Sequence, residues 1–182
     1  MKKQIAILRG INVGGKRKIL MADLKELFVD LGFEDIQTYI QSGNVMFNSS
    51  EKKDNILIAD EIEQSIFKEY GFTVPVIVIS VNELNKAIAE NPFFKKDSID
   101  IDRLHLTFLK EIPENEKLQN IKSYNYSPDK YEIKERNVFI YCSAKYSDSK
   151  LTNTFFESKL KVSATTRNWK TVISLSELSK SN

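Results

Sequence analysis

The chain has 182 residues, of which 41% are hydrophobic and 29% are charged, and its formal net charge is +2. This composition is typical of a globular protein with one domain or two small ones. The near balance of charge argues against a dedicated nucleic-acid binder with a strong field over a whole domain, but it is compatible with a local basic patch. The single cysteine, Cys142, excludes an intramolecular disulfide and a cysteine-cluster metal site. Without a signal-peptide core or an apolar run of membrane-spanning length, we expect a cytoplasmic protein with no membrane partner.

Hydrophobic periodicity in the first half predicts the order strand, helix, strand, strand, helix, strand. The strands are expected at 5–8, 36–41, 45–47 and 74–79, and the helices at 20–31 and 54–70. This is the order of a split βαβ, or ferredoxin-like, unit. Ser80 and Glu83 then form the pattern of a capping box, which predicts a further helix that runs to Glu90.

The second half, after a connector expected at 91–102, repeats this order in a degenerate form. Its expected elements are a strand at 104–109, a helix at 113–121, strands at 131–133 and 138–142, and a helix capped by Ser149 that runs to Leu160. The end departs from the repeat: residues 163–165 allow only a very short strand, and a final helix begins within Thr166–Trp169. We therefore predict an α+β protein with two ferredoxin-like lobes, at 1–90 and 91–182, antiparallel sheets and a C-terminal helix that buries Trp169.

The most informative segment is a glycine-rich, basic loop after the first strand. Its three glycines are Gly10, Gly14 and Gly15, and its cations are Arg9, Lys16, Arg17 and Lys18. Exposed backbone amides and this density of positive charge suit an anion such as phosphate. A tight turn with solvated lysines explains the same residues equally well.

The frame Gly10 to Lys16 has the spacing of a nucleotide-binding P-loop, but two features contradict that interpretation. The next residue is Arg17 instead of a serine or threonine that would bind Mg²⁺, and the helix does not begin at the Gly-Lys pair. We therefore expect no nucleotide triphosphatase, no metal and no cofactor.

A second turn, Ser42-Gly43-Asn44, is expected beside the loop. In the predicted topology the first and third strands are antiparallel neighbours, so the end of one lies near the start of the other. This places Arg9 and Gly10 beside Gly43 and Asn44, and it brings neutral donors from Gln41, Ser42 and Asn44 to the loop.

Arg167 and Asn168 are expected in the first turn of the final helix. An arginine there opposes the helix dipole, so it indicates an acidic partner, either a bound anion or an internal carboxylate.

Other chemical groups are sparse. His105 is the only histidine, and it is expected on the strand face opposite to Leu104 and Leu106, toward solvent. Cys142 ends an apolar strand and is expected to be a small core residue. Neither has the partners of a catalytic base or nucleophile.

Three blocks together carry a resemblance to a known family. They are Leu8-Arg-Gly-Ile-Asn-Val-Gly-Gly15 with Lys18 and Met21, Tyr39-Ile-Gln-Ser-Gly-Asn44-Val with Phe47, and Ala164-Thr-Thr-Arg167-Asn-Trp169-Lys-Thr-Val172. The chain resembles domain-of-unknown-function family 1697, a set of bacterial proteins. The resemblance implies a two-lobed α+β fold and no particular reaction. Lys170 departs from the family pattern, and Lys16-Arg17 makes the loop more basic than the pattern requires.

We therefore expect a binding module for a phosphate-bearing small molecule or a nucleic-acid backbone. The alternatives are an enzyme that stabilises a small anionic substrate electrostatically through Arg9, Asn12, Asn44 and Arg167, and loops that serve the fold alone. Oligomeric state is left open. The candidate ligand-binding residues are Arg9, Gly10, Asn12, Gly14, Gly15, Lys16, Lys18, Gln41, Ser42, Gly43, Asn44, Arg167 and Asn168.

Overall fold

The computed structural model describes residues 1–50, 53–94 and 100–180, and it divides the chain into two compact units. Unit 1 is Met1–Leu84 with the chain end from Ser179, and unit 2 is Asn85–Leu178. The division falls within α3 (Val81–Glu90), a few residues before the lobe boundary expected at 90/91. Residues 95–99 of the expected connector lie outside the described residues.

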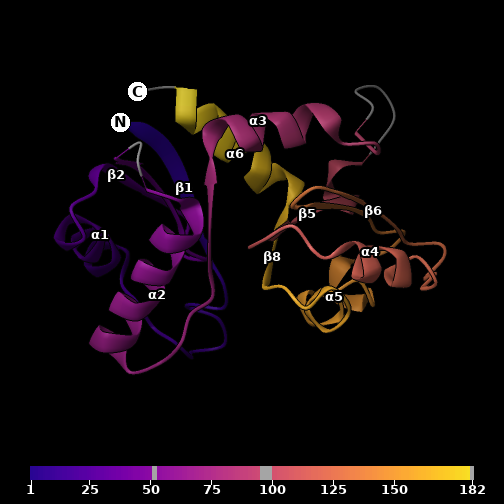
Figure 1. The fold of residues 1–182 in the computed structure, drawn as a ribbon, viewed down its shortest axis with the longest axis horizontal. Helices are drawn as coiled ribbons and strands as arrows, with labels where there is room; N and C mark the ends of the chain where they lie inside the picture. Colours follow the sequence, from indigo (N-terminus) through magenta and orange to yellow (C-terminus); the bar gives the residue numbers. More distant parts are fainter. Residues whose placement is uncertain (51–52, 95–99, 181–182) are drawn as a thin grey trace. The chain divides into compact units, whose positions relative to one another are not determined.

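Unit 1 has the expected βαββαβ order (Figure 1). Its elements are β1 (Lys2–Leu8), α1 (Met21–Asp30), β2 (Glu34–Tyr39), β3 (Asn44–Ser49), α2 (Asn55–Tyr70) and β4 (Val76–Ser80). The strands form an antiparallel sheet in the order β2-β3-β1-β4. The prediction of a ferredoxin-like first lobe is confirmed.

The core of unit 1 lies between the sheet and the two helices. Central strand β1 alternates its side chains between two buried faces, and Ala6 and Leu8 face α1 and α2. Leu24 and Phe28 of α1 and Ile62 of α2 lie in the same cluster. The amphipathic spacing of the helices therefore buries one stripe of each against a single face of the sheet.

The capping box predicted from Ser80 and Glu83 is present at the start of α3. The Ser80 hydroxyl accepts a hydrogen bond from the Glu83 backbone N–H at 3.2 Å, and the Glu83 carboxylate accepts one from the Ser80 backbone N–H at 2.7 Å. This reciprocal pair satisfies helix amides that would otherwise have no partner, so the signal is local and the prediction holds.

Unit 2 repeats the topology of unit 1 completely. Its elements are β5 (Leu104–Leu109), α4 (Asn115–Ile121), β6 (Lys130–Lys134), β7 (Asn137–Tyr141), α5 (Asn153–Leu160), β8 (Ala164–Asn168) and α6 (Trp169–Lys180). The sheet order is β6-β7-β5-β8, with all pairs antiparallel. The α+β class with antiparallel sheets and a C-terminal helix is confirmed, and the second unit is less degenerate than expected.

The expected final helix is present, but the expectation of only a very short strand at 163–165, with Arg167 and Asn168 in the first helical turn, is wrong. Residues 164–168 pair with the whole of central strand β5, from Leu109 opposite Ala164 to His105 opposite Asn168. The backbone of a buried central strand needs partners on both sides, and this long-range requirement overrides the local helical pattern.

All three helices of unit 2 begin later than expected, and α4 starts at Asn115 instead of residue 113. α6 starts at Trp169, and Asn168 caps it by accepting a hydrogen bond from the Thr171 backbone N–H at 2.8 Å. α5 is capped by Thr152 instead of Ser149, whose hydroxyl donates to the Asp129 carboxylate at 2.6 Å. Thr152 directly precedes the first residue of α5, and its hydroxyl accepts a hydrogen bond from the Phe155 backbone N–H at 3.2 Å.

Trp169 is fully buried, as predicted, and its ring lies 5.4 Å from that of Phe94. We expect Trp169→Ala to lower the free energy of unfolding by roughly 3–5 kcal/mol, because it removes a large buried surface and leaves a cavity. Urea unfolding followed by circular dichroism measures this without the tryptophan probe. The control is Phe67→Ala, whose side chain is 54% exposed and which should change stability little. A Trp169→Ala protein as stable as wild type would contradict the core assignment.

Candidate functional site

The glycine-rich loop and the 40–43 turn of unit 1 meet where β1 ends. The Leu8 backbone N–H donates to the Gly43 carbonyl at 2.8 Å, and Ile7 pairs with Asn44 in the ladder. On the other side of the strand, the Arg9 N–H donates to the Pro75 carbonyl at 2.9 Å. The predicted juxtaposition of the first loop and the second turn is therefore confirmed.

The loop folds into a small hairpin at residues 12–17. The Asn12 N–H donates to the Arg17 carbonyl, and the Lys16 N–H donates to the Val13 carbonyl, each at 3.1 Å. Gly14 and Gly15 form the two-residue turn with φ values of 58° and 73°. Such primed turns need positive φ at both positions, which explains the glycine pair without any ligand.

Asn12 ties the base of this hairpin to its surroundings. Its side-chain oxygen accepts from the Ile19 N–H at 3.0 Å, while its amide donates to the Ile19 carbonyl at 2.9 Å and to the Gln41 carbonyl at 3.0 Å. These three bonds use both amide hydrogens and the oxygen. The side chain of Asn12 therefore holds the loop and the turn together.

Buried side chains fill the inside of the second turn, at residues 40–43. Asn44 is fully buried, and its amide donates to the Tyr39 carbonyl at 3.1 Å, with the Ser42 hydroxyl at 3.5 Å. A Cβ atom at Gly43 would lie 2.7 Å from Cδ1 of Ile11 and 2.9 Å from Cβ of Leu8. Gly43 is thus required both by its φ of 80° and by the side chains packed against it.

The cations of the hairpin point into solvent. Lys16, Arg17 and Lys18 are all exposed, and their side chains make no ion pair or hydrogen bond with any residue that the structure describes. A Cβ at Gly10 would lie 3.2 Å from an Nη atom of Arg17, so the guanidinium rests against Gly10. Arg9 is half-buried at the base of the hairpin. Arg17, which is not among the candidate ligand-binding residues predicted from the sequence, belongs to the same exposed group.

Apolar side chains are exposed beside these cations. Val13, Leu20 and Ile40 are 63%, 68% and 46% exposed. Val13 follows Asn12 in the sequence, and Leu20 and Ile40 adjoin Ile19 and Gln41, to which the Asn12 side chain is hydrogen-bonded. The three apolar residues therefore lie around the base of the hairpin. Apolar periodicity places Leu20 in a helix at 20–31 and Ile40 in a strand at 36–41, but α1 begins at Met21 and β2 ends at Tyr39, so both residues lie just outside these elements.

Unit 2 offers an internal comparison for the loop. The Leu109 N–H donates to the Arg136 carbonyl and the Lys110 N–H to the Ser163 carbonyl, both at 2.9 Å, which repeats the two bonds at the end of β1. The connection that follows, 110–114, is short, has no glycine and carries two glutamates. The basic hairpin is therefore an addition to the shared topology that only unit 1 has.

Arg167 and Asn168 lie in β8 of unit 2, whereas the loop and the turn belong to unit 1. Their expected place in a first helical turn is wrong for the reason given above, so the argument from the helix dipole does not apply. Arg167 is buried opposite Leu106 and donates to the Thr166 carbonyl at 3.1 Å. Burial lowers the pKa of its guanidinium to about 10. Asn168 serves as the cap of α6.

His105 and Cys142 are core residues. His105 is 7% exposed and its ring stacks on Tyr146 at 4.4 Å, so the expectation that it faces solvent is wrong. The reason is that β5 is buried on both faces. Burial lowers the pKa of the His105 imidazole and raises the pKa of the Cys142 thiol to about 11. A thiol with this pKa is a poor nucleophile near neutral pH, which agrees with the predicted core role of Cys142.

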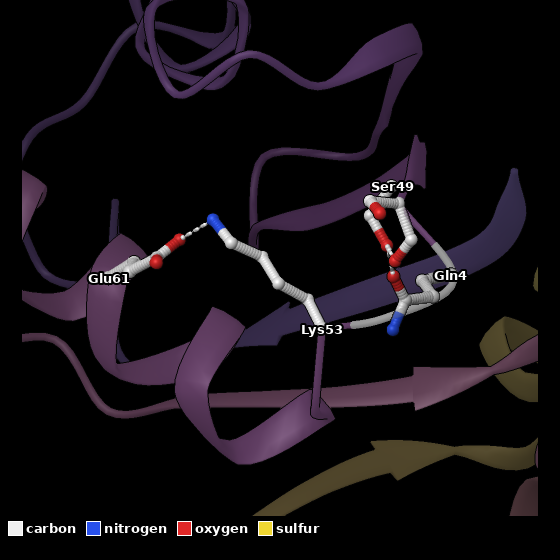
Figure 2. Close-up of polar contacts among 5 residues, drawn as sticks. Gln4, Ser49, Lys53 and Glu61 are labelled. Carbon is white, nitrogen blue, oxygen red and sulfur yellow. Dashed lines mark hydrogen bonds and ion pairs between the residues drawn. The ribbon is translucent and has the colours of Figure 1, made fainter.

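Polar side chains also gather at the opposite end of the unit 1 sheet, where they satisfy one another (Figure 2). The buried Gln4 accepts a hydrogen bond from the Ser49 hydroxyl and donates to Asn55. Nearby, Lys53 and Glu61 form an ion pair at 2.7 Å. Internal pairing of this kind indicates a structural role.

Gly43 and Gly15 provide a matched test of this geometry. We expect Gly43→Ala to lower the free energy of unfolding by roughly 2–5 kcal/mol, because the new methyl group adds overpacking to the strain of a positive φ. Gly15→Ala has a similar φ but no atom within 4 Å of the new Cβ, so only the backbone strain of about 1–2 kcal/mol should appear. Chemical denaturation measures both variants. Equal losses would show that the Ile11 contact does not constrain the turn.

The fold is similar to that of a solved protein described as the conserved bacterial protein SP0830 from Streptococcus pneumoniae. The TM-score is 0.78 at 22% sequence identity, over 98% of each chain. Comparison with curated proteins gives no significant match.

The described residues also lack two kinds of feature. None of their helices has both the length and the apolar character that crossing a membrane requires. No three of their histidine, cysteine, aspartate or glutamate side chains gather as metal ligands would.

The family resemblance carried by the loop and the turn is also supported by a family model. The model is that of the protein of unknown function DUF1697, and it matches residues 1–139, which include Met1–Leu84 of unit 1 and therefore the basic hairpin. The chain therefore belongs to the DUF1697 family.

Proposed function

We propose that this protein is a binding module for a phosphate-bearing ligand or nucleic-acid backbone, and that its contact surface is the hairpin at residues 12–17 together with the adjoining Lys18. The observation that carries the proposal is the exposed group Lys16, Arg17 and Lys18, which has no acidic partner among the described residues. Three cations held within one short hairpin create a local positive potential that attracts phosphate groups.

The rigidity of the hairpin supports this proposal. A flexible basic loop loses conformational entropy when it binds, and an ordered one loses less. Asn12 and the two cross-strand bonds of the hairpin supply that order before any ligand arrives. Unit 2 maintains the same topology without the hairpin, so the fold itself does not require these charges.

Binding fits the site better than catalysis. The side chains of Asn12 and Asn44 are engaged with backbone groups, and Asn44 is fully buried, so neither is available as a donor to a developing negative charge. His105 and Cys142 belong to the core of unit 2. The enzyme alternative therefore has no specific observation in its favour.

The double variant Lys16→Ala with Lys18→Ala tests the charges. We expect weaker binding to a fluorescent single-stranded RNA, with the slope of log K against log salt smaller by about 1.4, because each lost phosphate contact on a single strand removes about 0.7. Fluorescence anisotropy over a salt series measures this, and inorganic triphosphate as competitor distinguishes a small phosphate ligand from a nucleic-acid backbone. The melting temperature should not change.

The matched control is Lys25→Ala with Lys68→Ala, which removes the same charge from exposed positions of unit 1 outside the loop. It should retain nearly all of the binding. If wild-type protein binds neither RNA nor triphosphate at low salt, the binding proposal fails and the loop serves the fold alone.

Asn12→Ala tests the rigidity. It keeps every cation and removes the three bonds at the base of the hairpin, so the salt slope should stay the same. The affinity should fall by about fivefold, which corresponds to about 1 kcal/mol of extra ordering on binding. The same anisotropy series measures slope and affinity together. An unchanged affinity would show that order in the hairpin contributes nothing to binding.

A further inference from the structure

A second surface, at the free edge of the unit 2 sheet, is independent of the basic hairpin. β6 is the outermost strand in the order β6-β7-β5-β8. A cavity of about 710 Å³ lies beside it, between the strand, α4 and the segment that joins them. Figure 1 shows α4 and β6 close together in this unit.

The cavity runs along the open edge of β6. Successive residues of a strand point to opposite faces, yet Lys130 and Glu132 from one face and Tyr131 and Ile133 from the other all line it. Only a hollow that follows the edge meets both faces. Leu118 and Tyr124 add apolar surface on the α4 side.

The backbone at this edge is unpaired. Lys134 and Asn137 close a two-residue hairpin, so they form a hydrogen-bonded pair. Along an antiparallel ladder, hydrogen-bonded pairs alternate with non-hydrogen-bonded pairs, and Tyr131 and Ile133 belong to the second kind. The N–H and C=O groups of Tyr131 and Ile133 therefore point away from β7. They have no hydrogen-bond partner among the described residues.

The equivalent edge of unit 1 is built differently. A hollow lies beside β2 as well, but the register of β2 shifts between Glu34 and Gln37, and α1 packs against the strand. β6 keeps an unbroken register over all of its residues, and α4 packs on α5 instead. A bulge is a common way to prevent strand addition, and β6 lacks one.

The charges on β6 distinguish between possible partners. One face presents Lys130, Glu132 and Lys134, a positive, negative, positive pattern that reads the same in both directions. If a second copy paired with β6 over its full length, Glu132 would face Glu132 and Lys130 would face Lys134. Like charges opposite one another destabilise a strand pair, so the edge disfavours its own copy.

We propose that β6 and its cavity bind an extended peptide, which adds to the sheet as a fifth strand. The peptide carries the complementary pattern acidic, apolar, basic, apolar, acidic. Its backbone pairs with Tyr131 and Ile133, its charged residues face Lys130, Glu132 and Lys134, and its apolar residues enter the cavity beside Leu118. This is β-augmentation, in which main-chain hydrogen bonds provide affinity and alternate side chains provide specificity. The Lys134 ammonium pairs with Glu132 at 3.3 Å and donates to the Glu90 carbonyl at 3.1 Å. Both contacts are at least partly exposed, and such contacts are weak enough for a change of partner.

A charge-swap experiment tests the proposal. The two probes are acetylated, amidated peptides, Thr-Glu-Val-Lys-Val-Glu-Thr and the inverted Thr-Lys-Val-Glu-Val-Lys-Thr. The two proteins are the wild type and the variant Lys130→Glu with Glu132→Lys and Lys134→Glu. We expect wild type to bind the first peptide at least about tenfold more tightly than the second, and the variant to reverse that preference. Isothermal titration calorimetry measures all four affinities.

Backbone readouts separate strand addition from simple occupation of a pocket. Hydrogen exchange of the Tyr131 and Ile133 amides should slow on peptide binding. Two peptides, each N-methylated at one of the two alternating sets of residues, should behave differently. Methylation of the amides that face β6 should abolish binding because it removes the hydrogen-bond donors, and methylation of the other set should leave binding unchanged. Wild type alone should remain monomeric in sedimentation analysis.

Four outcomes overturn the proposal. They are no binding of either peptide, the same preference in both proteins, equal tolerance of both N-methylated sets, and self-association of wild type that the charge-swap variant changes. The last outcome would assign the edge to a second copy of the chain. None of them bears on the basic hairpin, whose test uses different probes and a different unit.

Discussion

The site in unit 1 depends on one constraint: the backbone polar groups at the end of a buried strand must find partners where water does not reach. β1 is buried along most of its length, and its last amide bonds to the Gly43 carbonyl, while the next residue bonds to Pro75. The chain then leaves the sheet at a defined point and in a defined direction. The side chain of Asn12 provides hydrogen-bond partners for the next backbone groups along the chain, those of Ile19 and Gln41, and so holds both residues at the base of the hairpin.

This constraint changes what the family motif means. Most of its polar and glycine residues have structural reasons: Gly14 and Gly15 make the turn, Gly43 leaves room for Ile11, and Asn44 caps its own turn from within. These structural reasons do not explain the exposed charges of Lys16, Arg17 and Lys18. The loop and the turn therefore form a rigid support, on which Lys16, Arg17 and Lys18 are exposed.

The internal repeat separates what the topology requires from what one unit has alone. The two units share element order, sheet order and the pair of hydrogen bonds at the end of the first strand. Features that both units have are explained by the topology, and features that one unit has alone need another explanation. The basic hairpin distinguishes unit 1 in this way, and the regular, open edge of β6 distinguishes unit 2. The basic hairpin is an addition to the shared framework, whereas the edge of β6 is a part of that framework that unit 2 leaves regular and open.

Local signals in the sequence determined most of unit 1 and the start of α3. The apolar spacing of α1 and α2, the β-branched run of β4 and the Ser80–Glu83 box each act within a few residues, so their consequences can be worked out from the sequence. The antiparallel pairing of β1 with β3 followed from the order of elements, and it placed the loop beside the turn correctly.

The tertiary structure alone decided the features that depend on distant partners. Residues 164–168 became a strand because β5 needed a second neighbour, which moved Arg167 and Asn168 out of the expected helix. His105 is buried because β5 is covered on both faces, and a single strand's alternation cannot reveal that. The bonds of Asn12, the space filled at Gly43 and the open edge of β6 likewise depend on which segments meet. A sequence records propensity residue by residue, whereas pairing and burial are properties of contacts between residues far apart in the chain.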